Sequence, residues 1–146
     1  MPYYMRWQSR PNEPERTERY QIFTDDECLW PTRAPRSPDG FTYLVSWDRA
    51  GIIKVGSTEY PARWRRFCGR GARLVLAVKA NWRDALDLEI NTQGVLNGFV
   101  AAAFSDKSES LEYLPDGGGW LECYRADPAG VERVMRGLIA RAVVQG

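Results

Sequence analysis

The most regular hydrophobic pattern in the chain lies between residues 41 and 56. Large apolar side chains occupy every second position from Phe41 to Trp47, which is the period of a β-strand. A second apolar run, from Ile52 to Gly56, follows a polar turn that ends at Gly51, and glycine accepts the positive φ of a tight turn. These features predict a β-hairpin.

The segment after the hairpin predicts a helix, a strand and a second helix. Pro61 suits a first helical turn, because the N–H that proline lacks would have no intrahelical partner there. We expect this helix to end near Cys68, and the apolar run from Leu74 to Ala80 to form a central strand. Asn81 is a suitable N-cap for the second helix. The expected buried stripe of that helix comprises Trp82, Ala85, Leu86, Ile90, Gln93 and Leu96, with Glu89 among or beside them.

The last part of the chain adds a strand and a helix. After the glycine-rich turn at residues 115–119, the run from Trp120 to Tyr124 predicts a fourth strand. Asp127 and Pro128 form a capping pair, and the apolar spacing after them predicts an amphipathic helix to about Val143. Together these elements indicate an α/β fold with a small, three- to four-stranded, mostly antiparallel sheet flanked by helices.

The same pattern divides the chain into three parts. Residues 1–40 hold six of the nine prolines and are expected to form an N-terminal arm and linker. Ile22 and Phe23 would pack this arm, and one helical turn would start at Thr24. Residues 41–124 would form the main domain, with residues 125–146 as a C-terminal helix packed on it. The arm is a candidate contact for a protein partner.

Composition narrows the function classes. The 146 residues are 44% apolar and 27% charged, which is ordinary for one folded domain. The chain has no histidine, which excludes Ser-His and Cys-His nucleophile pairs and His-ligated zinc. Its three cysteines are odd in number and widely spaced, so we expect buried thiols and not a disulfide framework. Without a signal-peptide or membrane-span pattern, the expected compartment is the cytoplasm of a bacterium or phage-infected cell.

The net charge of +1 hides an uneven distribution. Residues 40–97 hold nine basic residues against five acidic ones. Four arginines follow the hairpin within eight positions, at Arg63, Arg65, Arg66 and Arg70. This local excess favours a polyanion such as DNA as the partner, although a solvated, charged helix face has the same composition.

The order of these motifs resembles the GIY-YIG endonuclease superfamily over about residues 41–124. Tyr43 matches the tyrosine of the first signature, with Phe41 in place of its initial glycine. The segment Lys-Val-Gly at residues 54–56 resembles the second signature, in a phage and bacterial variant that carries lysine instead of tyrosine. Arg63 matches the arginine after that signature, and Glu89 matches the glutamate of the next long helix. The segment Gly-Gly-Trp-Leu at residues 118–121 is similar to a closing segment of that branch.

The resemblance implies a metal-dependent endonuclease that hydrolyses phosphodiester bonds in DNA. Glu89 would bind Mg²⁺ or Mn²⁺, and Arg63 would hold a nonbridging phosphate oxygen. Tyr43 would accept a proton from the attacking water, and Lys54 would be the cation beside it or a second phosphate contact. The expected nucleic-acid-binding residues are Arg65, Arg66, Arg70 and Arg73.

Each of these residues also has a purely structural interpretation. Tyr43 would be a core residue and Lys54 a charge at the rim of the sheet. Arg63 would pair with Glu59 one helical turn away, and a salt bridge to Arg63 or Lys54 would explain Glu89. Two other function classes therefore stay open. One is a catalytically inactive module that keeps the fold and binds nucleic acid, and the other is a phage accessory or protein-interaction protein that docks through residues 1–40.

Overall fold

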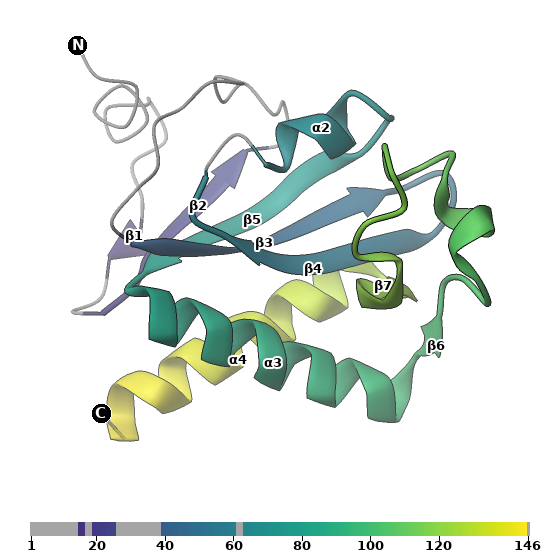
Figure 1. Cartoon of the computed structure of the whole chain (residues 1–146). Coiled ribbons are helices and arrows are strands. Elements are labelled where there is room, and N and C mark those ends of the chain that lie inside the picture. Colours follow the sequence, from purple (N-terminus) through teal and green to yellow (C-terminus); the bar gives the residue numbers. More distant parts are fainter. Residues whose placement is uncertain (1–14, 17–18, 26–38, 61–62, 146) are drawn as a thin grey trace, which may run out of the picture.

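The computed structural model describes residues 15–16, 19–25, 39–60 and 63–145. In this part the chain forms one sheet with helices on both faces (Figure 1). The strands are β1 Glu15–Arg16, β2 Gln21–Asp25, β3 Gly40–Trp47, β4 Ile52–Thr58, β5 Arg73–Ala80, β6 Ala101–Ala102 and β7 Cys123–Arg125. The helices are α2 Arg65–Cys68, α3 Trp82–Phe99 and α4 Pro128–Gln145, with the 3₁₀ turns η1 Lys107–Ser110 and η2 Trp120–Glu122.

The seven described strands follow the order β1-β2-β5-β3-β4-β7-β6, and each neighbouring pair is antiparallel. The predicted α/β class and antiparallel sheet are confirmed, whereas the predicted count of three to four strands is wrong. Two of the three additional strands are short. β1 and β6 have two residues each, too few to show a period of two, and β2 lies among the prolines that predicted an arm. Thr24, predicted to open a helical turn, lies in β2, and residues 26–38 lie outside the described residues.

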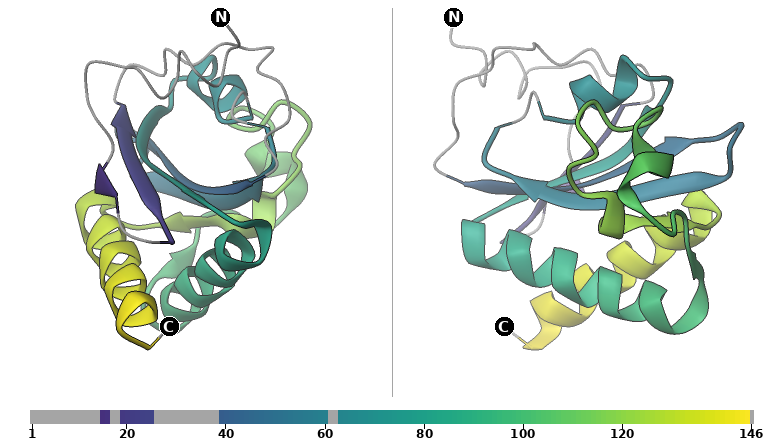
Figure 2. Two further views of the ribbon diagram at one scale, coloured as in Figure 1. Left: turned by 90° about the vertical axis from the view of Figure 1, so that its left-hand side faces the viewer. Right: turned by 45° about the vertical axis from the view of Figure 1, so that its right-hand side comes forward.

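The two faces of the sheet are covered differently (Figures 1 and 2). α2 and the segment between β6 and β7 cover one face, while α3 and α4 lie side by side on the other. All eight residues of β3 are buried, because its alternating side chains enter both layers. Phe41, Tyr43, Val45 and Trp47 project towards α2, and we call this side the aromatic face.

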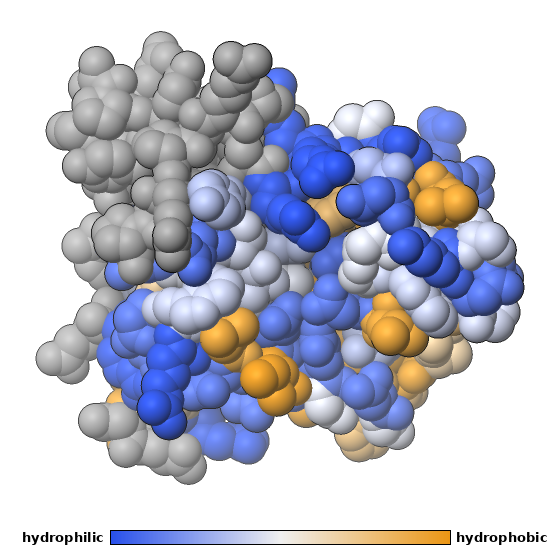
Figure 3. Space-filling model, viewed as in Figure 1, coloured by the Kyte–Doolittle hydropathy of each residue, from blue (hydrophilic) through white to orange (hydrophobic). Residues whose placement is uncertain are grey.

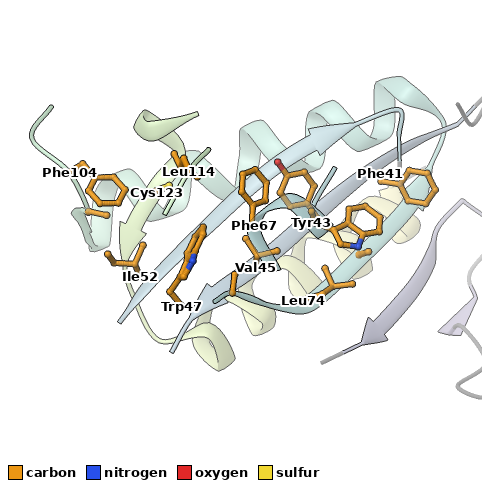
Figure 4. Packing of buried hydrophobic residues seen from close by; sticks show 14 of the residues in the cluster. Phe41, Tyr43, Val45, Trp47, Ile52, Phe67, Leu74, Phe104, Leu114 and Cys123 are labelled. Carbon is orange, nitrogen blue, oxygen red and sulfur yellow. The ribbon is translucent and has the colours of Figure 1, made fainter. Parts of the chain in front are cut away.

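Helix α2 is held on the aromatic face by rings. Phe67 of α2 packs against Tyr43 and Trp47, with ring centroids 6.0 and 6.1 Å apart, and Figure 4 shows this arrangement. Trp64, just before the helix, contacts Phe41 and Tyr43 at 5.7 and 5.8 Å. Trp64 and Phe67 are both buried. The helix itself is shorter than predicted, because regular α-helix begins only at residue 65, and Pro61 lies outside the described residues.

Helix α3 begins as predicted, and of the predicted buried stripe Ala85 and Leu96 are buried. The Asn81 side chain accepts a hydrogen bond from the Asp84 backbone N–H at 2.9 Å, so the N-cap is confirmed. However, Trp82 and Ile90 are exposed, and the buried residues are Asp84, Ala85, Leu88, Thr92 and Leu96. Asp84 can be buried because the Arg19 guanidinium pairs with it at 2.6 Å. The Thr92 hydroxyl bonds its own helix at the Leu88 carbonyl.

Two further expectations need correction. The predicted strand from Trp120 starts only at Cys123, because Gly119 takes a left-handed conformation with φ of 80° and turns the chain into η2. Cys68 is disulfide-bonded, where we expected a thiol, while Cys123 is a free and buried thiol as expected.

Candidate functional site

Tyr43 and Lys54 meet on the aromatic face because of the hairpin register. Tyr43 pairs with Gly56 and Val45 pairs with Lys54, so both polar side chains lie on the same side of neighbouring strands. The Lys54 ammonium donates to the Tyr43 hydroxyl at 3.1 Å and lies over the Tyr43 and Phe67 rings. Lys54 is only 1% exposed, so the expectation of a rim charge is wrong. A buried cation is costly unless it is paired and hydrogen-bonded.

Two glycines make room for the Lys54 ammonium. A Cβ on Gly56 would collide with the Tyr43 hydroxyl and come within 2.8 Å of Lys54 Nζ. A Cβ on Gly119 would lie 2.9 Å from the same nitrogen, and the positive φ of Gly119 also disfavours a side chain there. Both glycines therefore serve the close approach of backbone to the buried cation.

Glu122 supplies the opposite charge. Its carboxylate lies 3.2 Å from Lys54 Nζ and accepts a second hydrogen bond from the Gln93 amide at 3.2 Å. The same amide nitrogen donates to the Val55 carbonyl at 3.0 Å, which ties α3 to the edge of β4. Burial opposes ionisation of Glu122, yet Lys54 and the hydrogen bonds from Glu89 and Gln93 hold its pKa below the ordinary value.

Glu89 completes the group from α3. Burial, followed by the hydrogen bond and charge of Glu122, raises the pKa of Glu89 to about 7. A hydrogen bond from Ser57 and the Lys54 charge act in the opposite direction. These opposite pKa shifts favour the proton on Glu89 and the negative charge on Glu122. We call Tyr43, Lys54, Glu89, Gln93 and Glu122 the β4-edge cluster.

Arg63, the fourth residue expected in the site, is exposed and contributes no recorded contact to the β4-edge cluster. Its charge acts instead on Asp116. The backbone N–H of Gly118, then Arg66 and Arg63, lower the pKa of that carboxyl group. The structure thus joins Tyr43, Lys54 and Glu89, and leaves Arg63 at the surface near the loop that precedes η2.

The four expected nucleic-acid-binding arginines lie on different elements. Arg65 and Arg66 lie on α2, where Figure 3 shows a hydrophilic surface above the sheet. Arg70 follows the helix and donates to the Leu111 carbonyl at 2.9 Å. Arg73 belongs to β5 and pairs with Asp48 at 2.6 Å. They form two groups, one on the helix and one at the end of the hairpin.

Sequence reasoning missed Glu122, Gln93 and Ser57. Glu122 directly follows the Gly-Gly-Trp-Leu segment, but the predicted strand gave it no special position. The signal that could have identified it is physical. A lysine placed in a buried strand requires a carboxylate partner, and Glu122 is the acid next to the glycine-rich turn that could approach the strand closely.

The chain matches no family model. Neither a curated protein nor a solved structure gives a significant match. Within the described residues, no helix is long and apolar enough to cross a membrane, and no group of three or more Cys, Asp or Glu side chains gathers around a potential metal position.

The β4-edge cluster holds two carboxyl groups, the type of ligand that a hard divalent ion prefers, but both Glu122 oxygens are already bonded, one to Lys54 and one to Gln93. Glu89 and Glu122 offer carboxylate oxygens within one hydrogen-bonded pair. Mg²⁺ commonly uses one or two carboxylates and completes its coordination with water and substrate phosphate.

Proposed function

We propose that this chain is a metal-dependent DNA endonuclease of the GIY-YIG type, which hydrolyses phosphodiester bonds at the β4-edge cluster. The observation that supports it is the continuous contact from Tyr43 through Lys54 and Glu122 to Glu89. This arrangement places a hydroxyl, a cation and two carboxyl groups together, which are the groups that phosphodiester hydrolysis needs.

Each member has a distinct role in this proposal. Tyr43 is the group that takes a proton from the attacking water, and the Lys54 hydrogen bond at 3.1 Å orients its hydroxyl. The Lys54 ammonium also supplies positive charge against the phosphate. Arg63 is exposed, so its guanidinium is free to move towards a nonbridging oxygen of bound DNA.

Glu89 and Glu122 would hold Mg²⁺ or Mn²⁺. When bound, the ion supplies Lewis-acid polarisation of the phosphate and stabilises the leaving oxygen. Gln93 holds Glu122 in position through its bond to the Val55 carbonyl. The elevated pKa of Glu89 means that its proton competes with metal binding below about pH 7.

Plasmid cleavage in Mg²⁺ and Mn²⁺ tests this function. Glu89→Gln should lower the cleavage rate by about 100-fold or more, because the amide replaces a metal-binding carboxylate. Asp87→Asn is the matched control, since Asp87 lies on the same helix and is exposed, and it should cleave like the wild type. Cleavage that survives both Glu89→Gln and Glu122→Gln would reject the site.

A second candidate is a catalytically inactive module that binds nucleic acid. The observation in its favour is the burial of Tyr43 and Lys54, each 1% exposed, with Lys54 already paired to Glu122. DNA binding without cleavage in either metal would select this candidate. The third possibility, docking of a protein partner through residues 1–40, falls mostly outside the described residues.

A further inference from the structure

A hollow lies at the turn end of the β3–β4 hairpin. It has a volume of about 600 Å³, within the range of small-ligand sites. Its walls come from the hairpin turn, the connection between α2 and β5, and Tyr113. We call it the hairpin hollow. It is lined by Trp47, which lies four residues along β3 from Tyr43 of the β4-edge cluster.

The hairpin hollow carries an excess of positive charge. Three arginines line it, Arg49, Arg70 and Arg73, against one carboxylate, Asp48. Asp48 is fully engaged, because Arg73 donates to one of its oxygens and Ser46 to the other, both at 2.6 Å. The hydrogen bonds from Arg73 and then Ser46 lower the pKa of Asp48. Asp48 therefore orients Arg73 and leaves two arginine charges uncompensated in the lining.

Arg49 and Arg70 carry the two uncompensated charges, and both are placed to contact an anion in the hollow. Arg49 is exposed at the hairpin turn and makes no ion pair with a described residue. One guanidinium nitrogen of Arg70 donates to the Leu111 carbonyl, which orients the planar group without neutralising it. The Trp47 indole N–H donates to the Arg70 carbonyl at 3.1 Å, so the backbone that carries Arg70 is also fixed.

The floor of the hollow is aromatic and rigid. The Trp47 and Tyr113 rings meet edge to face with centroids 5.6 Å apart. Trp47 also packs against Phe67, which in turn packs against Tyr43. One row of rings therefore connects the hairpin hollow to the β4-edge cluster. The two sites are fixed relative to each other by packing on one strand.

We propose that the hairpin hollow binds a backbone phosphate of the DNA duplex, at a fixed spacing from the phosphate at the β4-edge cluster. Arginine forks match phosphate oxygens. Four residues of strand span about 13 Å, so the two phosphates would lie within a few nucleotides of each other on the duplex. The choice of DNA as ligand rests on the proposed function; the anion site itself rests on the hollow and its arginines.

The test measures binding separately from cleavage. A fluorescein-labelled duplex of about 20 base pairs is titrated in EDTA at several salt concentrations. Arg49→Ala and Arg70→Ala should each weaken binding by roughly 3- to 10-fold and reduce the slope of log K against log salt by about 1. Arg133→Ala is the control, because Arg133 is exposed on α4, on the opposite face of the sheet. It should leave affinity and slope unchanged.

Duplexes with one uncharged methylphosphonate test the spacing. When the neutral linkage is moved one position at a time away from the cut site, it should weaken wild-type binding at one position within a few nucleotides, and it should leave Arg49→Ala binding unaffected there. Arg49→Ala and Arg70→Ala proteins that bind like Arg133→Ala would overturn the hairpin hollow as a phosphate site. Wild-type protein that shows arginine-dependent binding but no cleavage would instead refute the nuclease and leave this site standing.

Discussion

The β4-edge cluster and the hairpin hollow both place cations on the aromatic face, but they hold them in opposite ways. Lys54 is 1% exposed and is paired with Glu122 and Tyr43. Arg49 is exposed and makes no ion pair with a described residue. Loss of a buried charge from its pair is strongly destabilising, whereas exposed charges contribute little to folding. The cluster is thus suited to chemistry at fixed atoms, and the hollow to reversible contact with an anion.

The strongest test of this comparison removes the buried cation. Lys54→Met should destabilise the protein by about 3 kcal/mol, because Glu122, whose side chain is 33% exposed, would lose its charged hydrogen-bond partner. Urea denaturation measures the effect. The double variant Lys54→Met/Glu122→Gln should recover a large part of the loss. A single variant as stable as the wild type would show that Lys54 is not an obligatory partner of Glu122.

A smaller effect should follow from filling the space beside the ammonium. Gly56→Ala should cost about 1–3 kcal/mol of unfolding free energy, since its methyl group would displace the Tyr43 hydroxyl and Lys54 Nζ. DNA cleavage should fall with it, because the contact between Tyr43 and Lys54 is broken. Gly94→Ala on α3, which has open space around it, is the control and should be neutral or stabilising. Equal stability of the two variants would contradict the packing.

The pH dependence of stability separates Glu89 from the rest of the cluster. Its pKa is raised from 4.5 to about 7 by burial and Glu122, so between these values the folded state holds more protons than the unfolded chain. Stability should therefore fall as pH rises from 4.5 to 7. Glu89→Gln should remove this decrease in stability between pH 4.5 and 7, and it should raise Tm at pH 8 by about 3 °C. Thermal unfolding in EDTA at pH 5 and 8 measures both effects, and an unchanged pH slope in Glu89→Gln would contradict the assignment.

The smallest expected effect lies at the hollow. Arg49→Ala should change the unfolding free energy by less than about 0.5 kcal/mol, while still weakening DNA binding. The same denaturation assay measures this. A loss comparable to that of Lys54→Met would mean that Arg49 has a structural partner and that the two regions are not different in kind.

Local pattern was sufficient to predict the hairpin, β5, the Asn81 cap and α4, because each is specified by residues that are neighbours in sequence. It also placed Tyr43, Lys54 and Glu89 among the candidates through a family resemblance. The two-residue strands β1 and β6 were not predicted, because they form through pairing with a neighbouring strand and are too short to show a period of two.

The remaining failures involve partners far apart in the chain. Glu122 is 68 residues from Lys54, so nothing local marks it as the counter-charge. The burial of Asp84 was not predicted, because its partner, Arg19, lies 65 residues away. Hydrophobic spacing assumes that polar residues face water, and this assumption fails where a distant ion pair satisfies them.

The incomplete pairing of β4 has a consequence beyond catalysis. β7 pairs only with Ile52, Ile53 and Lys54, so within the described part of the chain the outer edge from Val55 to Thr58 has no strand beside it. Open edges invite strands from other molecules to add, and proteins protect them with side chains and charges. Here the Gln93 amide occupies the Val55 carbonyl, and Glu122 stands next to it. Variants that replace Gln93 or Glu122 would leave this strand edge unprotected. We expect them to self-associate through the edge while the fold is still intact.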